Sequence, residues 1–277
     1  MLLSGICVFS FAAAVALCLG TGALDTLAWL WMLPVGFVGF WLGFLILALL
    51  FLAAACAVVD KEKEQAHDNG FYRAMAPLYI ALVIRFGRVR IHTQGMEKLP
   101  REGRFLLVCN HQNDIDPAVL LHCFPESQLA FISKKENRDM PIVGSIMHRI
   151  MCQLMDREND RQALKVILKC IQLIKDDEVS IGVFPEGYCS RDGKLHHLKG
   201  GVFKIAQKAN VPIVVCTIRD TKQALHKLLR LRASDVTLHL VDVIPAEELK
   251  GVSTVEIAER VYEMMLADMG EEYRAEE

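Results

Sequence analysis

The chain has 277 residues, a formal net charge of −2 and a hydrophobic content of 53%. A net charge this close to zero excludes the strongly basic surface that marks many nucleic-acid-binding proteins, so no nucleic-acid partner is predicted. The length allows one catalytic domain of ordinary size with an additional segment. The mean hydropathy of +0.29 is high for a soluble protein, and the excess of apolar residues lies at the N-terminal end.

Two long apolar stretches occupy the first 59 residues, and no Lys or Arg precedes Lys61. The first runs from about Leu2 to Leu19, and the second from about Thr26 to Val59 with Pro34 near its start. A helix needs about 20 residues to cross a bilayer, so the first stretch is nearly long enough and the second is longer than necessary. A secretory signal peptide would begin with basic residues, which are absent here, so residues 1–59 are predicted to form a two-helix membrane anchor.

The distribution of basic residues predicts the orientation of this anchor. Gly20 to Asp25, between the two stretches, contains no Lys or Arg, whereas six basic residues follow the second stretch: Lys61, Lys63, Arg73, Arg85, Arg88 and Arg90. By the positive-inside rule, the two stretches form a hairpin and the following domain lies on the cytoplasmic face. A re-entrant pair that does not cross the bilayer has the same hydropathy and is an alternative.

Six of the nine cysteines follow the apolar stretches, and none of them is paired at the spacing of a metal site. Most stand in apolar runs, which predicts buried, reduced thiols and agrees with a cytosolic face. No metal and no cofactor is predicted.

A charged connector and an amphipathic segment fill residues 60–87. The segment Phe71–Phe86 combines apolar positions with flanking arginines. A helix of this kind either lies on the membrane surface, with its cations near anionic headgroups, or packs on the catalytic domain. The sequence favours neither alternative.

Strands and helices alternate from residue 88 to residue 270, which predicts one α/β domain with a mixed, largely parallel sheet flanked by helices. The expected strands are Arg88–Thr93, Arg104–Cys109, Gln128–Ser133, Met151–Met155, Val179–Phe184, Val211–Thr217 and Asp235–Val243. The expected helices are Pro117–Cys123, Pro141–Ile150, Asp160–Lys175, Gly201–Ala209, Thr221–Leu231 and Thr254–Met269. The acidic tail, residues 271–277, is expected to be solvated or disordered.

The clearest helical periodicity lies in Asp160–Lys175. Apolar residues recur there at the spacing of one helix face: Leu164, Ile167, Leu168, Ile171 and Ile174. This pattern predicts that the helix buries that face.

A histidine and an aspartate five positions apart, His111 and Asp116, follow the apolar run Phe105–Cys109. Side chains at such strand-to-helix turns line ligand clefts in α/β proteins, and histidine exchanges protons near neutral pH. Asp116 precedes Pro117 and an apolar run, which is typical of a helix N-cap. Capping uses one carboxylate oxygen, so the other would accept the Nδ1 proton of His111 and leave Nε2 as a base. A metal site formed with Asp114 is an alternative, although no second group of ligands is evident.

A Pro-Glu-Gly turn follows another apolar strand, Val179–Val183. Such turns are common, but a place at a strand end lets this one face the same cleft as His111. Glu186 is then a candidate to bind a substrate hydroxyl or a neighbouring cation. Gly187 would allow the backbone to approach a ligand closely.

Three cations near these strand ends are candidates for binding an anionic substrate. Arg157 closes a further strand, and its planar guanidinium matches a phosphate, with an ion pair to a neighbouring acid as the alternative. Arg191 and Lys199 follow the Pro-Glu-Gly turn in a glycine-rich segment that is otherwise interpreted as a solvated loop.

Taken in order, these segments resemble the four motifs of the glycerolipid acyltransferase family, whose best-known members are the 1-acylglycerol-3-phosphate acyltransferases. Asn110, His111 and Asp116 match the first motif, and Phe184–Gly187 match the third. The resemblance covers about residues 100–220. It rests on the ordered set of motifs rather than on any one of them.

Three positions depart from the family's pattern. Met151 stands where the second motif, which ends at Arg157, usually has glycine. Val215 replaces the last proline of the fourth motif, which Val211–Val214 otherwise match. Cys189 stands where lysophosphatidate enzymes commonly have arginine, so the headgroup of the acyl acceptor is left open.

The resemblance implies a membrane-bound acyltransferase. Such an enzyme would move a fatty acyl group from an acyl-CoA or acyl-carrier-protein thioester to the free hydroxyl of a lysophospholipid, above all 1-acylglycerol-3-phosphate. His111 would be the general base and Asp116 its support, while backbone N–H groups near the His-Asp turn would stabilise the oxyanion. The acceptor would be bound by the remaining candidates: Arg157, Glu186, Gly187, and Arg191 or Lys199.

Two other functions fit part of the sequence. A hydrolase would use His111 to activate water against a thioester or a phospholipid, although no Gly-x-Ser-x-Gly element is present. A non-catalytic lipid-binding membrane protein would not need His111 for its activity.

Overall fold

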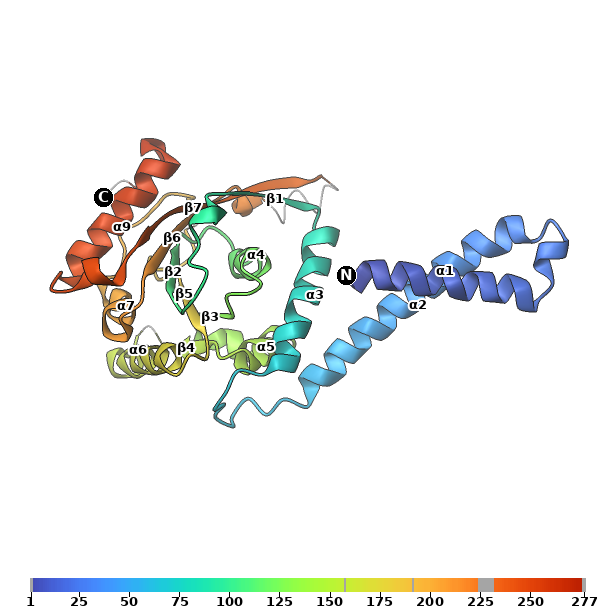
Figure 1. Cartoon of the computed structure of the whole chain (residues 1–277), viewed down its shortest axis with the longest axis horizontal. Coiled ribbons are helices and arrows are strands. Elements are labelled where there is room, and N and C mark those ends of the chain that lie inside the picture. The colour runs from blue at the N-terminus through green and yellow to red at the C-terminus, as the bar shows by residue number, and fades with distance from the viewer. Residues whose placement is uncertain (1, 157, 191, 224–231, 276–277) are drawn as a thin grey trace. The chain divides into compact units, whose positions relative to one another are not determined.

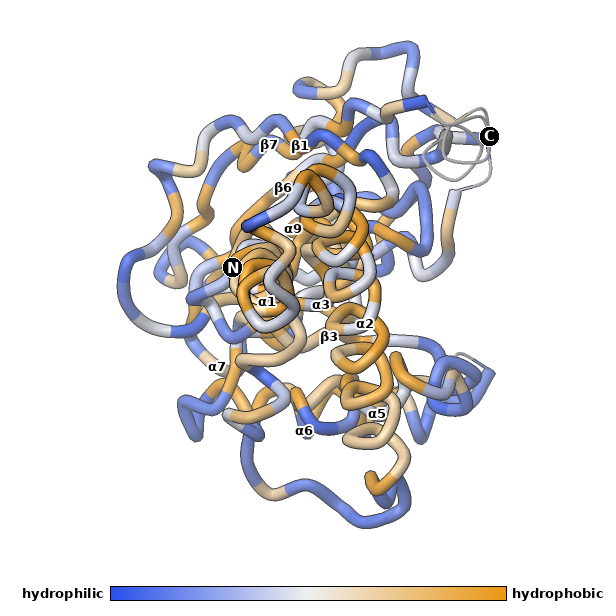
Figure 2. The backbone as a smooth tube through the Cα atoms, turned by 90° about the vertical axis from the view of Figure 1, so that its right-hand side faces the viewer, coloured by the Kyte–Doolittle hydropathy of each residue, from blue (hydrophilic) through white to orange (hydrophobic). Residues whose placement is uncertain are grey.

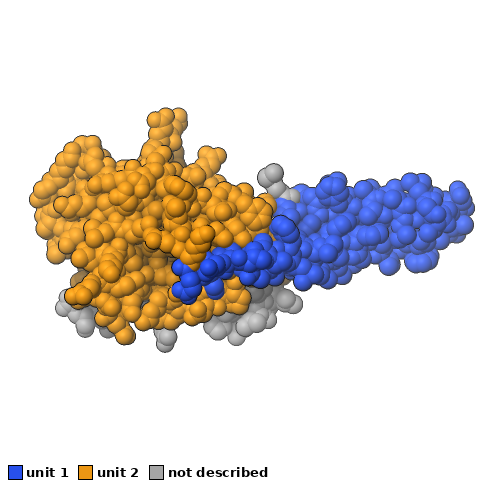
Figure 3. Space-filling model, turned by 90° about the horizontal axis from the view of Figure 1, so that it is seen from below, with its two compact units in different colours: residues 1–62 blue, residues 63–277 orange. Residues whose placement is uncertain are grey.

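The structure is a computed structural model that describes residues 2–156, 158–190, 192–223 and 232–275. Two compact units divide the chain, residues 1–62 and residues 63–277 (Figure 3). The first unit contains the two apolar stretches, and the second contains every motif described above.

The first unit is a pair of apolar helices, α1 (Leu2–Gly20) and α2 (Trp29–Ala57), joined by a 3-10 turn, η1 (Ala23–Asp25). Gly36 of α2 lies against Ala14 of α1, the close approach that small residues allow between membrane helices. Most of the large apolar side chains of both helices are exposed, and both tubes are mostly orange in Figure 2. Each helix is long and apolar enough to cross a bilayer. These properties indicate association with a membrane.

A seven-stranded sheet forms the centre of the second unit, in the order β1-β7-β6-β2-β5-β3-β4 (Figure 1). All neighbouring strands are parallel except β6 and β7, which are antiparallel. The prediction of a mixed, largely parallel sheet is therefore confirmed. The strands in chain order are β1 (Val89–Gln94), β2 (Leu106–Cys109), β3 (Leu129–Lys134), β4 (Gln153–Met155), β5 (Ser180–Val183), β6 (Ile213–Arg219) and β7 (Ser234–Ile244).

Burial along the strands follows from their place in the sheet. Every residue of β2 and β5 is buried, because helices cover both faces of a parallel sheet. In β7, at the antiparallel end, buried and more exposed residues alternate. Each of the seven strands overlaps one of the seven segments expected from the sequence.

Helices cover the two faces of the sheet in two groups (Figure 1). One face carries α3 (Gly70–Phe86), α4 (Asp116–Cys123) and α5 (Val143–Arg149). The other carries α6 (Asp160–Lys175), α7 (Lys204–Ala209) and α9 (Thr254–Met269). The bounds of α6 and α9 coincide with the predicted ones, because Asn159 and Ser253 cap their first turns.

Two of the predicted helices differ in form. The segment expected as one helix over Gly201–Ala209 begins as a 3-10 turn, η4 (Gly200–Phe203), before α7. The segment expected over Thr221–Leu231 begins as a 3-10 turn, η5 (Thr221–Gln223), and its remainder lies outside the described residues.

The predicted apolar face of α6 is partly wrong. Leu164 and Leu168 are exposed, whereas Val166, Cys170 and Leu173 are buried. Ile171 and Ile174 of the predicted face are buried as expected. The face that packs on the sheet and on α7 is therefore rotated from the predicted one and also includes Val166, Cys170 and Leu173. Apolar spacing alone could not tell how far around the helix the sheet would cover it.

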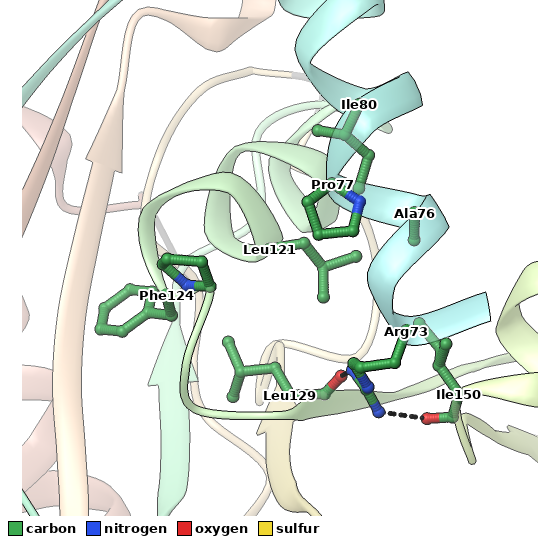
Figure 4. Close-up of a pocket in the computed structure, with 9 residues that line it drawn as sticks. Arg73, Ala76, Pro77, Ile80, Leu121, Phe124, Leu129 and Ile150 are labelled. Carbon is green, nitrogen blue, oxygen red and sulfur yellow. Dashed lines mark hydrogen bonds between the residues drawn. The ribbon is translucent and has the colours of Figure 1, made fainter. Parts of the chain in front are cut away.

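Helix α3 packs on the second unit, which is one of the two alternatives for this segment. Met75, Tyr79 and Leu82 are buried against the domain. A small apolar pocket lies between α3, α4 and β3 (Figure 4). Arg73 closes one end of it by donating to the carbonyls of Leu129 and Ile150, so this arginine faces the domain rather than a membrane surface.

The acidic tail is exposed, as expected, but its described part is ordered. Residues Glu271–Tyr273 form a 3-10 turn, η7. Leu195 N–H donates to the carbonyl of Tyr273 at 2.7 Å, and Ala275 N–H donates to the carbonyl of Leu195 at 3.3 Å. Backbone pairing of this kind holds residues 271–275 against the loop that contains Leu195, so of the two alternatives for the tail these residues follow the solvated one.

Candidate active site

The candidate residues gather at the carboxyl ends of β2 and β5, which are parallel neighbours in the sheet. His111 follows β2, and Phe184–Gly187 follow β5. Parallel strands present their carboxyl ends at one edge, where open α/β sheets bind ligands. The first and third motifs therefore meet in space, as the sequence predicted.

His111 and Asp116 are hydrogen-bonded, with 2.9 Å between Nδ1 and Oδ2. The same carboxylate oxygen accepts the backbone N–H groups of Gln112 and Asn113 at 2.7 and 2.8 Å. Asp116 is fully buried. Because Oδ2 accepts from three groups, it favours the tautomer in which Nδ1 of His111 carries the proton.

Asp116 does not cap the helix that it begins, and this expectation is wrong. No hydrogen bond runs from its side chain to the first turn of α4. The carboxylate points back to the loop before the helix, where it closes the turn that contains Gln112 and Asn113. The two oxygens of Asp116 therefore do not divide the work of capping the helix and orienting His111. Oδ2 alone accepts the bonds from His111, Gln112 and Asn113.

The main chain of His111 is held by the segment after β5. Its N–H donates to Oε1 of Glu186 at 2.8 Å, and its carbonyl accepts the N–H of Ser190 at 2.8 Å. Oε2 of Glu186 accepts the N–H of His196 at 3.2 Å. We call this set of bonds the main-chain clamp. It fixes His111 between two loops that are far apart in the sequence.

Glu186 is buried, and both of its oxygens bind backbone N–H groups. Burial raises the pKa of Glu186 to about 7, and the N–H groups of His111 and His196 oppose this rise. In this geometry Glu186 positions the loop that contains His111, and its predicted role as a ligand of the substrate stays a prediction.

The imidazole of His111 stacks on the ring of Phe184, with 4.1 Å between centroids and 21° between planes. Phe184 in turn stacks on Phe131 of β3 at 5.8 Å. Gly182 makes room for this stack, because a Cβ there would overlap the ring of Phe131. Beside these two phenylalanine rings, the side chain of His111 is 14% exposed. Within the described residues, Nε2 of His111 has no hydrogen-bond partner.

Three backbone N–H groups at the His-Asp turn are already occupied. The N–H of His111 binds Glu186, and those of Gln112 and Asn113 bind Asp116. These three N–H groups are therefore not free for an oxyanion, and stabilisation of an oxyanion by other N–H groups near the turn stays a prediction.

Asn110 has a role that the sequence did not reveal. Its side-chain amide donates to the carbonyl of Ile218 at 2.9 Å and accepts the N–H of Ile218 at 2.7 Å. The two bonds join the end of β2 to β6, across 108 residues of sequence. Asparagine before histidine was part of the first motif, but nothing in the sequence pointed to its partner.

Gly187 and Lys199 lie together beside the Pro-Glu-Gly turn. Gly187 has φ of +81°, and a Cβ there would meet Cε and Nζ of Lys199 at 2.9 Å. The N–H of Lys199 donates to the carbonyl of Pro185 at 2.8 Å. The side chain of Lys199 is exposed and, within the described part of the chain, takes part in no ion pair.

The two predicted arginines, Arg157 and Arg191, lie outside the described residues. Asp114 is exposed in the turn before α4. Among the described residues, no group of three or more His, Cys, Asp or Glu side chains is placed to hold a metal ion.

Comparison with known proteins gives consistent matches. Residues 90–219 match the family model described as Acyltransferase. The putative 1-acyl-sn-glycerol-3-phosphate acyltransferase acl-2 of Caenorhabditis elegans is 27% identical over 181 residues, 64% of each chain. A chloroplastic 1-acyl-sn-glycerol-3-phosphate acyltransferase of Brassica napus, BAT2, is 32% identical over 152 residues, 54% of this chain and 43% of the relative. The chain thus spans less than two thirds of the length of either relative.

One solved structure has a similar fold. The crystal structure of the 1-acyl-sn-glycerophosphate acyltransferase of Thermotoga maritima superimposes with a TM-score of 0.58 at 22% identity. The match covers 82% of this chain and 89% of the other. At this identity the likeness is one of fold.

The raised pKa of Glu186 predicts a pH-dependent stability that Glu186→Gln removes. Folding raises this pKa from near 4.5 to about 7, so its stabilising contribution is complete below pH 4.5 and is lost as the pH rises through 7. The free energy of unfolding should fall by about 3 kcal/mol over this pH range. Thermal unfolding of the full chain in detergent, at about pH 5 and about pH 8, measures it. Wild type should lose more stability between the two pH values than Glu186→Gln, and equal losses would contradict this account of Glu186.

Proposed function

We propose, on the premise that residues 90–219 belong to the acyltransferase family, that the protein is an O-acyltransferase acting on a lysophospholipid. The acyl group comes from a thioester, either acyl-CoA or acyl carrier protein. The favoured acceptor is 1-acylglycerol-3-phosphate, and the product is then phosphatidic acid. The observation that carries the proposal is the His111–Asp116 pair at the carboxyl edge of the sheet, in which Nδ1 is bound to Asp116 and the His111 side chain is 14% exposed.

The reaction needs one proton acceptor that can return its proton. Nε2 of His111 removes the proton of the acceptor hydroxyl as the hydroxyl oxygen attacks the thioester carbonyl. A tetrahedral intermediate forms and collapses, and the C–S bond breaks. The leaving thiolate takes the proton back from the imidazolium, which gives the acylated lipid and a free thiol. A thioester is already activated, so the proposal includes no metal and no covalent enzyme intermediate.

Asp116 supports this cycle by geometry and by charge. The 2.9 Å bond to Nδ1 keeps the imidazole in the tautomer that has Nε2 free. When His111 is protonated, the buried carboxylate stabilises the imidazolium at the same distance. The main-chain clamp and the ring of Phe184 keep the imidazole in place through the cycle.

The acceptor's phosphate is assigned to the cations near the Pro-Glu-Gly turn. Lys199 supports this assignment, because its Nζ lies over Gly187, close to the turn that holds His111. Arg157 and Arg191, which lie outside the described residues, are proposed to contribute further cations. Lys199 thereby supplies a cation beside Gly187, two residues before position 189, where this chain has cysteine instead of arginine.

The two apolar helices of the first unit are proposed to anchor the enzyme as a hairpin, with the catalytic domain on the cytoplasmic face. Both helices have the length and composition for this role. Acceptor and product are then held in the same membrane as the enzyme, while the thioester donor comes from the aqueous side.

His111→Ala should abolish acyl transfer by the purified full chain, and Asp116→Asn should lower kcat about 100-fold or more with a smaller effect on KM. The assay offers a panel of lysolipids with acyl-CoA or acyl-carrier-protein donors, and it measures acylated lipid and free fatty acid separately. Near wild-type transfer by a well-folded His111→Ala protein would contradict the mechanism. Free fatty acid as the main product would indicate a hydrolase instead.

Lys199→Gln should raise KM for 1-acylglycerol-3-phosphate roughly tenfold with kcat nearly unchanged, because one charge-assisted bond to the phosphate is lost. Lys250→Gln, at an exposed lysine after the 3-10 turn η6 (Ala246–Leu249), is the matched control. Steady-state kinetics on both variants tests the assignment. It is contradicted if the two variants have the same KM.

A further inference from the structure

Four consecutive apolar residues are exposed on the second unit, at residues 140–143. Met140, Ile142 and Val143 are 45%, 36% and 44% exposed, and Pro141 between them is also exposed. Isolated exposed apolar side chains are ordinary, but a continuous run of this length is unfavourable in water unless it meets a partner. We call residues 140–143 the apolar loop.

The apolar loop is held in a defined shape. Gly144 is buried against the carbonyl of Arg138, and a Cβ at this position would overlap it. Gly144 N–H donates to the carbonyl of Met140 at 3.0 Å, and Met140 N–H donates to that of Asn137 at 3.3 Å. Ser145 Oγ donates to the carbonyl of Pro141 at 3.2 Å. These bonds hold the backbone while the side chains of the loop point outward, so their exposure is built into the structure.

The topology places the apolar loop at the edge of the sheet that carries the candidate active site. The loop lies in the crossover from β3 to β4, directly after a 3-10 turn, η3 (Lys135–Asp139), and its last residue, Val143, is the first residue of α5. β3 is parallel to β5, and β5 to β2, so the chain leaves β3 at the same edge at which it leaves β2 toward His111. α5 also lies on the same face of the sheet as α4, which begins at Asp116 (Figure 1).

We propose that the apolar loop inserts into the boundary between headgroups and acyl chains of a lipid bilayer, and that the lysolipid enters the site beside it. This inference rests on the proposed function. A bilayer is favoured over a protein partner because the same chain carries two helices of membrane length. Lys134 is exposed at the end of β3 and suits an anionic headgroup, whereas Lys135 forms an ion pair with Asp156 at 2.7 Å, and Glu136 and Asp139 share this segment.

Entry beside the loop gives a physical reason for its place. The acceptor keeps its acyl chain in the bilayer while its headgroup and free hydroxyl reach the edge where His111 lies. Insertion of Met140, Ile142 and Val143 buries their apolar surface and holds this edge against the membrane. The anchor helices keep the enzyme at the membrane, and the loop determines which edge of the catalytic domain faces it.

Photocrosslinking tests the contact directly. The full chain carries p-benzoylphenylalanine in place of Ile142, in vesicles of phosphatidylcholine and phosphatidylglycerol, and adducts are identified by mass spectrometry. The matched control carries the same residue in place of Val255, which is 62% exposed on α9, on the other face of the sheet. Phospholipid adducts are expected at position 142 and not at position 255. Absence of lipid adducts at 142, or adducts only with a protein such as an added acyl carrier protein, would overturn the inference.

A kinetic comparison tests the consequence for substrate entry. Ile142→Glu should lower the rate with a long-chain acceptor in vesicles roughly tenfold, since a charge opposes insertion. The rate with a short-chain acceptor that is monomeric in solution should stay close to wild type. Equal losses on both acceptors would contradict entry beside the loop.

Crosslinking needs no turnover, so a protein that gives lipid adducts but transfers no acyl group would refute the proposed function and leave the membrane contact intact.

Discussion

The main-chain clamp on His111 is the constraint on which the candidate site depends. The N–H of His111 donates to Glu186, 75 residues further along the chain, and its carbonyl accepts from Ser190. These bonds tie the carboxyl end of β2 to that of β5, and the ring of Phe184 covers the imidazole. The direction of Nε2 follows from this arrangement together with the bond from Nδ1 to Asp116. The first and third motifs, which are separate in the sequence, are thus joined by hydrogen bonds into one structural unit.

Burial of the Glu186 carboxyl group within the main-chain clamp costs stability. Burial raises the pKa of Glu186 to about 7, which means that the charged form is unfavourable in the folded protein. Two backbone N–H groups offset part of this cost, and they also give the carboxylate its function as a positioning group. Groups that are unfavourable in isolation commonly occur at active sites, where the surrounding structure holds them in place.

Much of the fold could be predicted from the sequence because it depends on local patterns. Short apolar or alternating segments located all seven strands, and helical patterns located α6 and α9, whose first turns are capped by Asn159 and Ser253. The His-Asp pair was predicted because its five-residue spacing closes within one turn. The partners of Glu186 and Asn110 were not predictable, since both bind backbone groups on other strands or loops. The prediction that Asp116 caps the helix was wrong, because its carboxylate binds backbone N–H groups that come before Asp116 in the sequence. A side chain's type limits what it can bind, whereas its partner depends on which strands are neighbours.

We propose above all that His111 is held as a base, with its proton on Nδ1 and with Nε2 free. Nitrogen NMR of the full chain in detergent, with ¹⁵N-labelled histidine and His111→Ala to assign the signal, measures this tautomer directly. In wild type, the neutral ring should carry a proton on Nδ1 and none on Nε2. Asp116→Asn, which removes the acceptor charge, should weaken this preference. A wild-type His111 with its proton on Nε2, unchanged by Asp116→Asn, would contradict the claim.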